Sequence, residues 1–67
     1  MDRETLVAAL KTVDRHIAQI QAEIERLRLE IDKLDRAGRA TADVRVVVDK
    51  LEEALGLYFE YRQQLSD

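Results

Sequence analysis

The single histidine is the first residue whose chemistry could serve a reaction or a metal ion. His16 has Asp14 and Glu23 nearby on a predicted helix, so a pH-sensitive or metal-binding imidazole is one interpretation. A structural zinc site takes about four ligands, however, and the chain has no cysteine. We therefore interpret His16 as a flanking polar residue partly covered by Tyr61, and we predict no metal site and no cofactor.

The other groups able to do chemistry do not converge on one point. Ser66 is the only serine, so the residues of a Ser-His-Asp triad are not gathered in any part of the sequence. Glu52 and Glu53 are adjacent, and adjacent side chains on a helix point about 100° apart. We predict no catalytic residue and a non-enzymatic function.

Three arginines near the middle of the chain offer a different chemistry, the binding of an anion. Arg36, Arg39 and Arg45 surround the predicted start of a second helix, where a phosphate or carboxylate could bind. The stretch has no glycine-rich loop, and Asp35 and Asp43 oppose the positive charge. The formal net charge of −3 also argues against nucleic acid as a partner. We interpret this stretch as a solvated turn.

Arg62 interrupts an otherwise apolar helical stripe, where an unpaired charge is unfavourable. Antiparallel pairing of two helices places it level with about residue 16, so Asp14 is the expected partner. We favour a structural ion pair, and contact with an anionic substrate is the alternative.

The segment 48–52, Val-Asp-Lys-Leu-Glu, is similar to a known signature. Together with Tyr58 it resembles the Ser-Gln-Glu-Leu-Asp motif and following tyrosine of the Spo0E-like aspartyl-phosphatase family. Val48 stands at the serine position and Glu52 at the aspartate position. The resemblance covers about residues 24–59. It implies a helical hairpin that acts on a phosphorylated response regulator, with Glu52 as the acidic residue.

These residues belong to two predicted helices. Apolar residues recur at alternating steps of four and three from Leu6 to Leu34, which is a heptad seam over four repeats. Asp2 or Thr5 suits the start of this helix, and Gly38 suits its end. We predict an all-α fold, an antiparallel and coiled-coil-like helical hairpin that forms one domain over residues 1–67. The expected bounds are about 2–36 for the first helix, 37–41 for the turn with Thr41 as the next N-cap, and about 42–65 for the second helix.

The predicted hairpin has more apolar surface than it can cover. The second helix has an apolar arc of roughly 160°, which is wider than the contact made by one neighbouring helix. The first helix is longer, about 35 residues against about 24, and leaves Leu6, Val7 and Leu10 beyond the end of the second. Chains of this length rarely fold alone without a disulfide or a metal. We therefore predict a homodimer that forms a four-helix bundle. The predicted interface comprises Leu6, Leu10, Val13, Val47, Val48, Leu51, Ala54, Leu55, Tyr58, Tyr61 and Leu65.

The aromatic residues Tyr58, Phe59 and Tyr61 fall within four positions of one another. We expect them in the core or the dimer interface, and a docking site for a different protein is the alternative. Leu29, Val46 and Leu57 fall outside the main stripes and are interpreted as singly exposed residues.

The sequence favours a small interaction or assembly module, an adaptor or regulator that binds through a helical face. Alternatives are a Spo0E-like phosphatase regulator and one half of a hetero-oligomer, with another helical protein as the partner. No apolar run approaches about 18 residues, and the first residues lack the pattern of a secretory signal. We expect a cytoplasmic protein that binds neither membrane nor nucleic acid.

Overall fold

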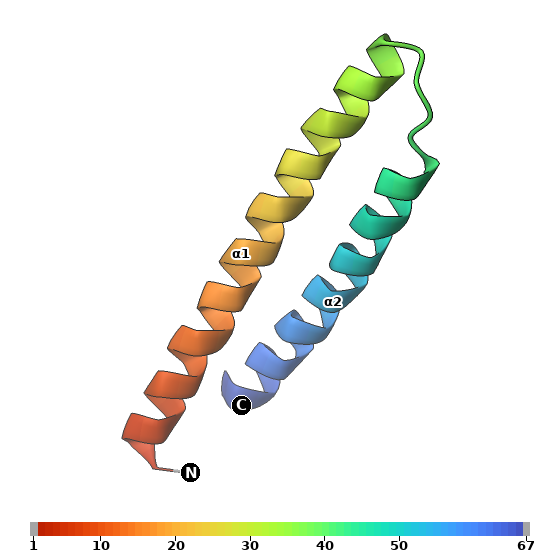
Figure 1. The fold of residues 1–67 in the computed structure, drawn as a ribbon. Coiled ribbons are helices and arrows are strands. Elements are labelled where there is room, and N and C mark those ends of the chain that lie inside the picture. Colours follow the sequence, from red (N-terminus) through yellow and green to blue (C-terminus); the bar gives the residue numbers. More distant parts are fainter. Residues whose placement is uncertain (1, 67) are drawn as a thin grey trace.

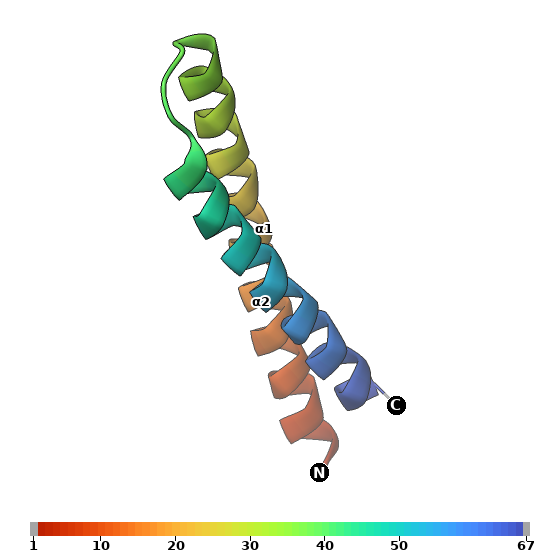
Figure 2. The same ribbon diagram turned by 90° about the vertical axis from the view of Figure 1, so that its right-hand side faces the viewer.

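The protein is a pair of long helices joined by a short turn. In the computed structural model, which describes residues 2–66, helix α1 (Arg3–Arg36) and helix α2 (Ala42–Ser66) run antiparallel and side by side (Figure 1). The two helices pack against each other along the length of α2, which confirms the predicted all-α helical hairpin (Figure 2). The hairpin is narrow, with Cα extents of 54 × 14 × 13 Å.

Helix α1 begins at a capped N-terminus. The backbone amide of Thr5 donates a hydrogen bond to Asp2 Oδ1 at 2.7 Å, so Asp2 is the N-cap and Thr5 lies inside the first turn. The same hydrogen bond holds the pKa of the Asp2 carboxyl below its ordinary value. Glu4 in the first turn also faces the positive end of the helix dipole.

Gly38 ends α1, as its position in the sequence predicts. Its φ of +69° lies in the left-handed region, and its amide donates a hydrogen bond to the Asp35 carbonyl at 3.1 Å. The amide of Arg39 donates to the Leu34 carbonyl at 2.8 Å. These two bonds form the Schellman motif, which satisfies carbonyls that the end of a helix would otherwise leave free.

Thr41 immediately precedes α2. Its carbonyl accepts the first helical hydrogen bond, from the Arg45 amide at 3.0 Å, so Thr41 occupies the N-cap position. Its hydroxyl accepts a second bond from Arg45 Nε at 2.9 Å. Arg45 is thereby held against the turn that connects the helices.

The core is small and comes mainly from the heptad seam of α1. Within residues 2–66, the buried apolar side chains are Val13, Ile17, Ile24 and Ile31 from α1 and Val48 from α2. Side chains such as Leu27 and Leu51 pack on this core and remain partly exposed. As far as the structure describes them, neither helix combines the length and the apolar character that crossing a bilayer requires.

Candidate functional site

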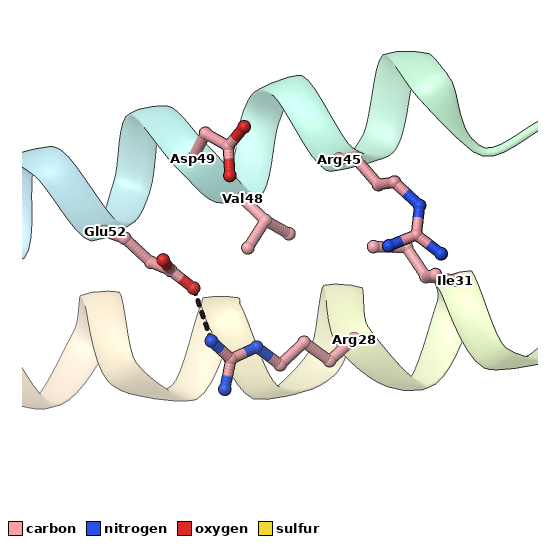
Figure 3. Close-up of a pocket in the computed structure, with 6 residues that line it drawn as sticks. All are labelled: Arg28, Ile31, Arg45, Val48, Asp49 and Glu52. Atoms are coloured by element: carbon pink, nitrogen blue, oxygen red, sulfur yellow. Dashed lines mark hydrogen bonds and ion pairs between the residues drawn. The ribbon is translucent and has the colours of Figure 1, made fainter.

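A groove between the helices near the turn is the first candidate for a binding site. It has a volume of about 540 Å³ and is lined by side chains of both helices. Its lining residues are Arg28, Ile31, Arg45, Val48, Asp49 and Glu52. Figure 3 shows Arg28 and Glu52 reaching toward each other from opposite helices, and their charged groups form an ion pair. An incoming anion would therefore compete with a carboxylate that the arginine already binds.

Glu52 is the acidic residue that the phosphatase resemblance would assign to the reaction. Its carboxylate accepts a hydrogen bond from the Arg28 guanidinium, across the two helices. Val48, at the serine position of the motif, is buried in the hairpin core. The segment thus serves the packing of α2 on α1.

Two of the three arginines of the turn are also engaged by neighbouring carboxylates. Arg36 pairs with Asp32 at 3.0 Å, and Arg45 pairs with Asp35 at 3.1 Å. Both pairs are more than half exposed on each side chain. Arg39 is exposed and takes part in no ion pair among residues 2–66, so carboxylates of the two helices compensate the positive charge of Arg36 and Arg45 only.

Arg62 pairs with Asp14, which is the partner that antiparallel register predicts. Arg62 Nε lies 2.6 Å from Asp14 Oδ1, and the two side chains are 46% and 51% exposed. Such an exposed pair contributes about 0–1 kcal/mol to stability. The stripe that Arg62 interrupts includes Val48 and packs on α1, and Arg62 itself is partly exposed, so its guanidinium reaches both Asp14 and water.

The ion pairs that join the helices share one side of the hairpin. Among residues 2–66, three pairs join α1 to α2, and an angle of 100° per residue places all of them on the same side of the plane through the two helix axes. We call this the charged side. It is defined by the pairs Asp14–Arg62, Arg28–Glu52 and Asp35–Arg45.

The opposite side of the hairpin is largely apolar, and we call it the apolar side. Several of its residues are well exposed, among them Leu57 at 62% and Val47 and Tyr61 at 48% each. Two shallow hollows lie on it, one lined by Ala54, Leu57, Tyr58 and Tyr61 and the other between Tyr58, Tyr61 and the start of α1. The apolar side is defined by Ile20, Leu27 and Leu34 on α1 and by Val47, Ala54, Leu57, Tyr58, Tyr61 and Leu65 on α2.

His16 lies at the edge of the apolar side. Its ring stacks on that of Tyr58, with centroids 5.4 Å apart and an interplanar angle of 18°. The expected cover, Tyr61, lines the same hollow but is not the stacking partner. Among residues 2–66, no group of three or more His, Cys, Asp or Glu side chains is placed to hold a metal ion. The imidazole therefore serves as part of an aromatic contact.

The residues of the predicted interface fall into three sets. Val13 and Val48 are only 2% and 6% exposed, because the hairpin itself covers them. Val47, Ala54, Tyr58, Tyr61 and Leu65 lie on the apolar side with surface left uncovered. Leu6, Leu10, Leu51 and Leu55 are partly buried between these extremes.

Leu57 is exposed, as the sequence predicts, but it does not stand alone, and Phe59 does not lie with the two tyrosines. Leu57 follows Ala54 by three residues and precedes Tyr61 by four, so it belongs to a row on α2 rather than standing alone. That spacing is the signal that identifies it. Phe59 projects toward the charged side, away from the two tyrosines, and is 46% exposed.

Comparison with known proteins adds no further information on the site. No family model matches this chain, and no curated protein or solved structure matches it. A function must therefore be argued from the surfaces of the hairpin itself.

Proposed function

We propose that the chain is a non-enzymatic interaction and assembly module that works as a homodimer, in which two hairpins pack through their apolar sides into a four-helix bundle. The observation that carries this proposal is the division of the hairpin into a charged side and an apolar side. Three ion pairs join the helices on the first side, whereas exposed apolar groups on the second side face solvent. The proposal keeps the cytoplasmic location expected from the sequence.

The accessible surface of the hairpin supports an interface of ordinary size. The chain exposes 5342 Å², whereas a compact monomer of 7.8 kDa exposes about 4400 Å². The excess is about 1000 Å², and a standard protein interface buries about 800 Å² on each partner. A second hairpin laid on the apolar side would cover an area of this size.

The small core supports the same proposal. Two helices in contact bury few side chains completely, and long helices gain most of their stability from packing an apolar face. A partner on the apolar side would complete the burial of Ile20, Leu27 and Leu34, which the hairpin covers only in part. Association and folding are therefore expected to be coupled.

The test is the absolute mass of the chain in solution, measured by light scattering over a dilution series with helicity followed by circular dichroism. We expect a mass of twice 7.8 kDa, with helicity lost as the dimer dissociates on dilution. A fully helical monomer over the whole concentration range would contradict the homodimer. In that case the apolar side is free in the isolated protein, and a different helical protein becomes the candidate partner.

Two leucines provide a matched pair of variants for the same measurement. Leu57 on the apolar side is 62% exposed, and Leu29 on the outer surface of α1 is 61% exposed. Because their exposure is the same, Leu57→Lys and Leu29→Lys have similar effects on an isolated hairpin. We expect Leu57→Lys to weaken association and Leu29→Lys to leave it unchanged. Equal association of the two variants would place the interface elsewhere.

A further inference from the structure

One positive charge interrupts the apolar side of α2. The residues Val47, Lys50, Ala54, Leu57 and Tyr61 follow one another at steps of three and four, so they form a single row along the helix. Lys50 is the only charged residue among these five, and one turn earlier the row begins with Asp43 at the start of α2. Among residues 2–66 its ammonium group takes part in no ion pair.

Two carboxylates occupy the corresponding row of α1. Glu23 and Glu30 alternate there with Leu27 and Leu34. Glu23 is paired with Arg26 on its own helix, and this pairing holds the pKa of the Glu23 carboxyl below its ordinary value. Within the described chain Glu30 takes part in no ion pair. Glu30 on α1 and Lys50 on α2 therefore carry opposite charges, and neither is held in an ion pair among the described residues.

Lys50 and Glu30 lie at the same height along the hairpin. The pair Arg28–Glu52 joins the helices directly, and Lys50 and Glu30 are each two residues from it in the direction of the turn. Their side chains lie on the apolar side. Each points about 100–120° away from the direction of the neighbouring helix. The two side chains therefore point toward a partner packed on the apolar side and not toward each other. Their charges are complementary but separated within one chain.

We infer that the occupant of the apolar side is a second copy of the chain aligned with its turn at the same end, so that α2 of each copy lies on α1 of the other. This inference rests on the proposed homodimer and specifies its geometry. A two-fold axis along the hairpin keeps every residue at its own height, so Lys50 of each copy lies opposite Glu30 of the other. The complementary pair then occurs twice.

The opposite alignment lacks this complementarity. With the turns at opposite ends, the two-fold axis is perpendicular to the long axis of the hairpins. Helix α1 of one copy then packs on α1 of the other, and the two copies of Glu23 lie near each other at the middle of this contact. Lys50 then faces the second α2 near Gln64, which carries no charge. Charged residues beside a helical seam set partner orientation even where they add little affinity. The rows therefore favour the alignment with adjacent turns.

A distance between spin labels separates the two alignments. The chain has no cysteine, so Arg39→Cys introduces a single labelling site at the exposed turn. With the turns together, electron paramagnetic resonance should give a label distance below about 30 Å, since neighbouring helices lie about 8–10 Å apart. With the turns apart, the distance approaches the 54 Å length of the hairpin.

A second label serves as the control for dimer formation. Ala22→Cys lies near the middle of α1 on its exposed outer surface, so its label distance is similar in both alignments. A distance at position 22 together with a short distance at position 39 supports the inference. A distance at position 22 with a long one at position 39 overturns the alignment and leaves the homodimer intact. A monomeric mass with no distance at either position overturns both proposals.

Discussion

Replacing each glycine of the chain by alanine is expected to change stability in opposite directions. Gly38 and Gly56 are the only glycines, and a methyl group at either position would meet no atom within 4 Å. Crowding is therefore absent at both sites, so the backbone conformation decides the sign of the effect.

The magnitudes follow from the two backbone positions. Gly56 lies in the interior of α2 on an exposed surface, where alanine is more favourable than glycine by about 1 kcal/mol. Gly38 has a φ of +69°, and the left-handed conformation costs an L-residue roughly 1–2 kcal/mol. We expect Gly56→Ala to raise the free energy of unfolding by about 1 kcal/mol. We expect Gly38→Ala to lower it by a similar amount.

Urea unfolding followed by far-UV circular dichroism measures both changes. The chain concentration must be the same for all three proteins, because association contributes to apparent stability. In thermal unfolding, 1 kcal/mol corresponds to roughly 4–8 °C for a domain of this size. The wild-type protein should therefore melt between the two variants.

The expected stability changes of the two variants are tested independently, and a contrary result for either variant has its own interpretation. If Gly38→Ala were as stabilising as Gly56→Ala, the left-handed end of α1 would be refuted. If Gly56→Ala were destabilising, the exposed surface of α2 around Gly56, one turn from Glu52 of the charged side, would have to be covered. That result would move the partner away from the apolar side.

Three further predictions concern the core, the dimer and the N-cap. Val48→Ala should lower the free energy of unfolding by about 2 kcal/mol, whereas Val46→Ala, at an exposed site, should change it little in the same urea titration. Lys50→Glu and Glu30→Lys should each raise the dimer dissociation constant by roughly tenfold, and the double variant should restore it, as measured by sedimentation equilibrium. The pKa of Asp2 is lowered on folding, so its contribution to stability is present above its ordinary value of 3.8 and is lost as the pH falls below it. Asp2→Asn should remove this part of the acid dependence in unfolding curves recorded against pH, and an unchanged dependence would exclude the cap as its source.

The features predictable from the sequence were those that depend on local chemistry or on register. The heptad seam specified α1 because only a helix brings residues at such steps to one face. Gly38 specified the end of that helix because its left-handed backbone favours glycine. The Arg62–Asp14 pair followed from counting residues back from the turn in an antiparallel hairpin.

The rotation of each helix about its own axis could not be obtained in this way. The apolar stripe of α2 is wider than the surface that one neighbouring helix covers. Periodicity alone does not indicate which part of such a stripe packs on α1. Val48 was therefore assigned to the dimer interface although α1 covers it, and Leu57 was set aside although it lies on the apolar side. The packed hairpin supplies that rotation, and with it the separation of charged and apolar sides.

Desolvation explains why a partner should choose the apolar side. Burying the charged side would remove water from the pairs of Arg28, Arg45 and Arg62, and the cost of desolvating such charges can exceed the attraction between them. Covering Leu57 and Tyr61 instead removes apolar surface from water, which gains about 25 cal/mol per Å². Contact on the apolar side is therefore more favourable for a partner than contact on the charged side. The proposed association through the apolar side alone favours a closed dimer over an open chain of hairpins.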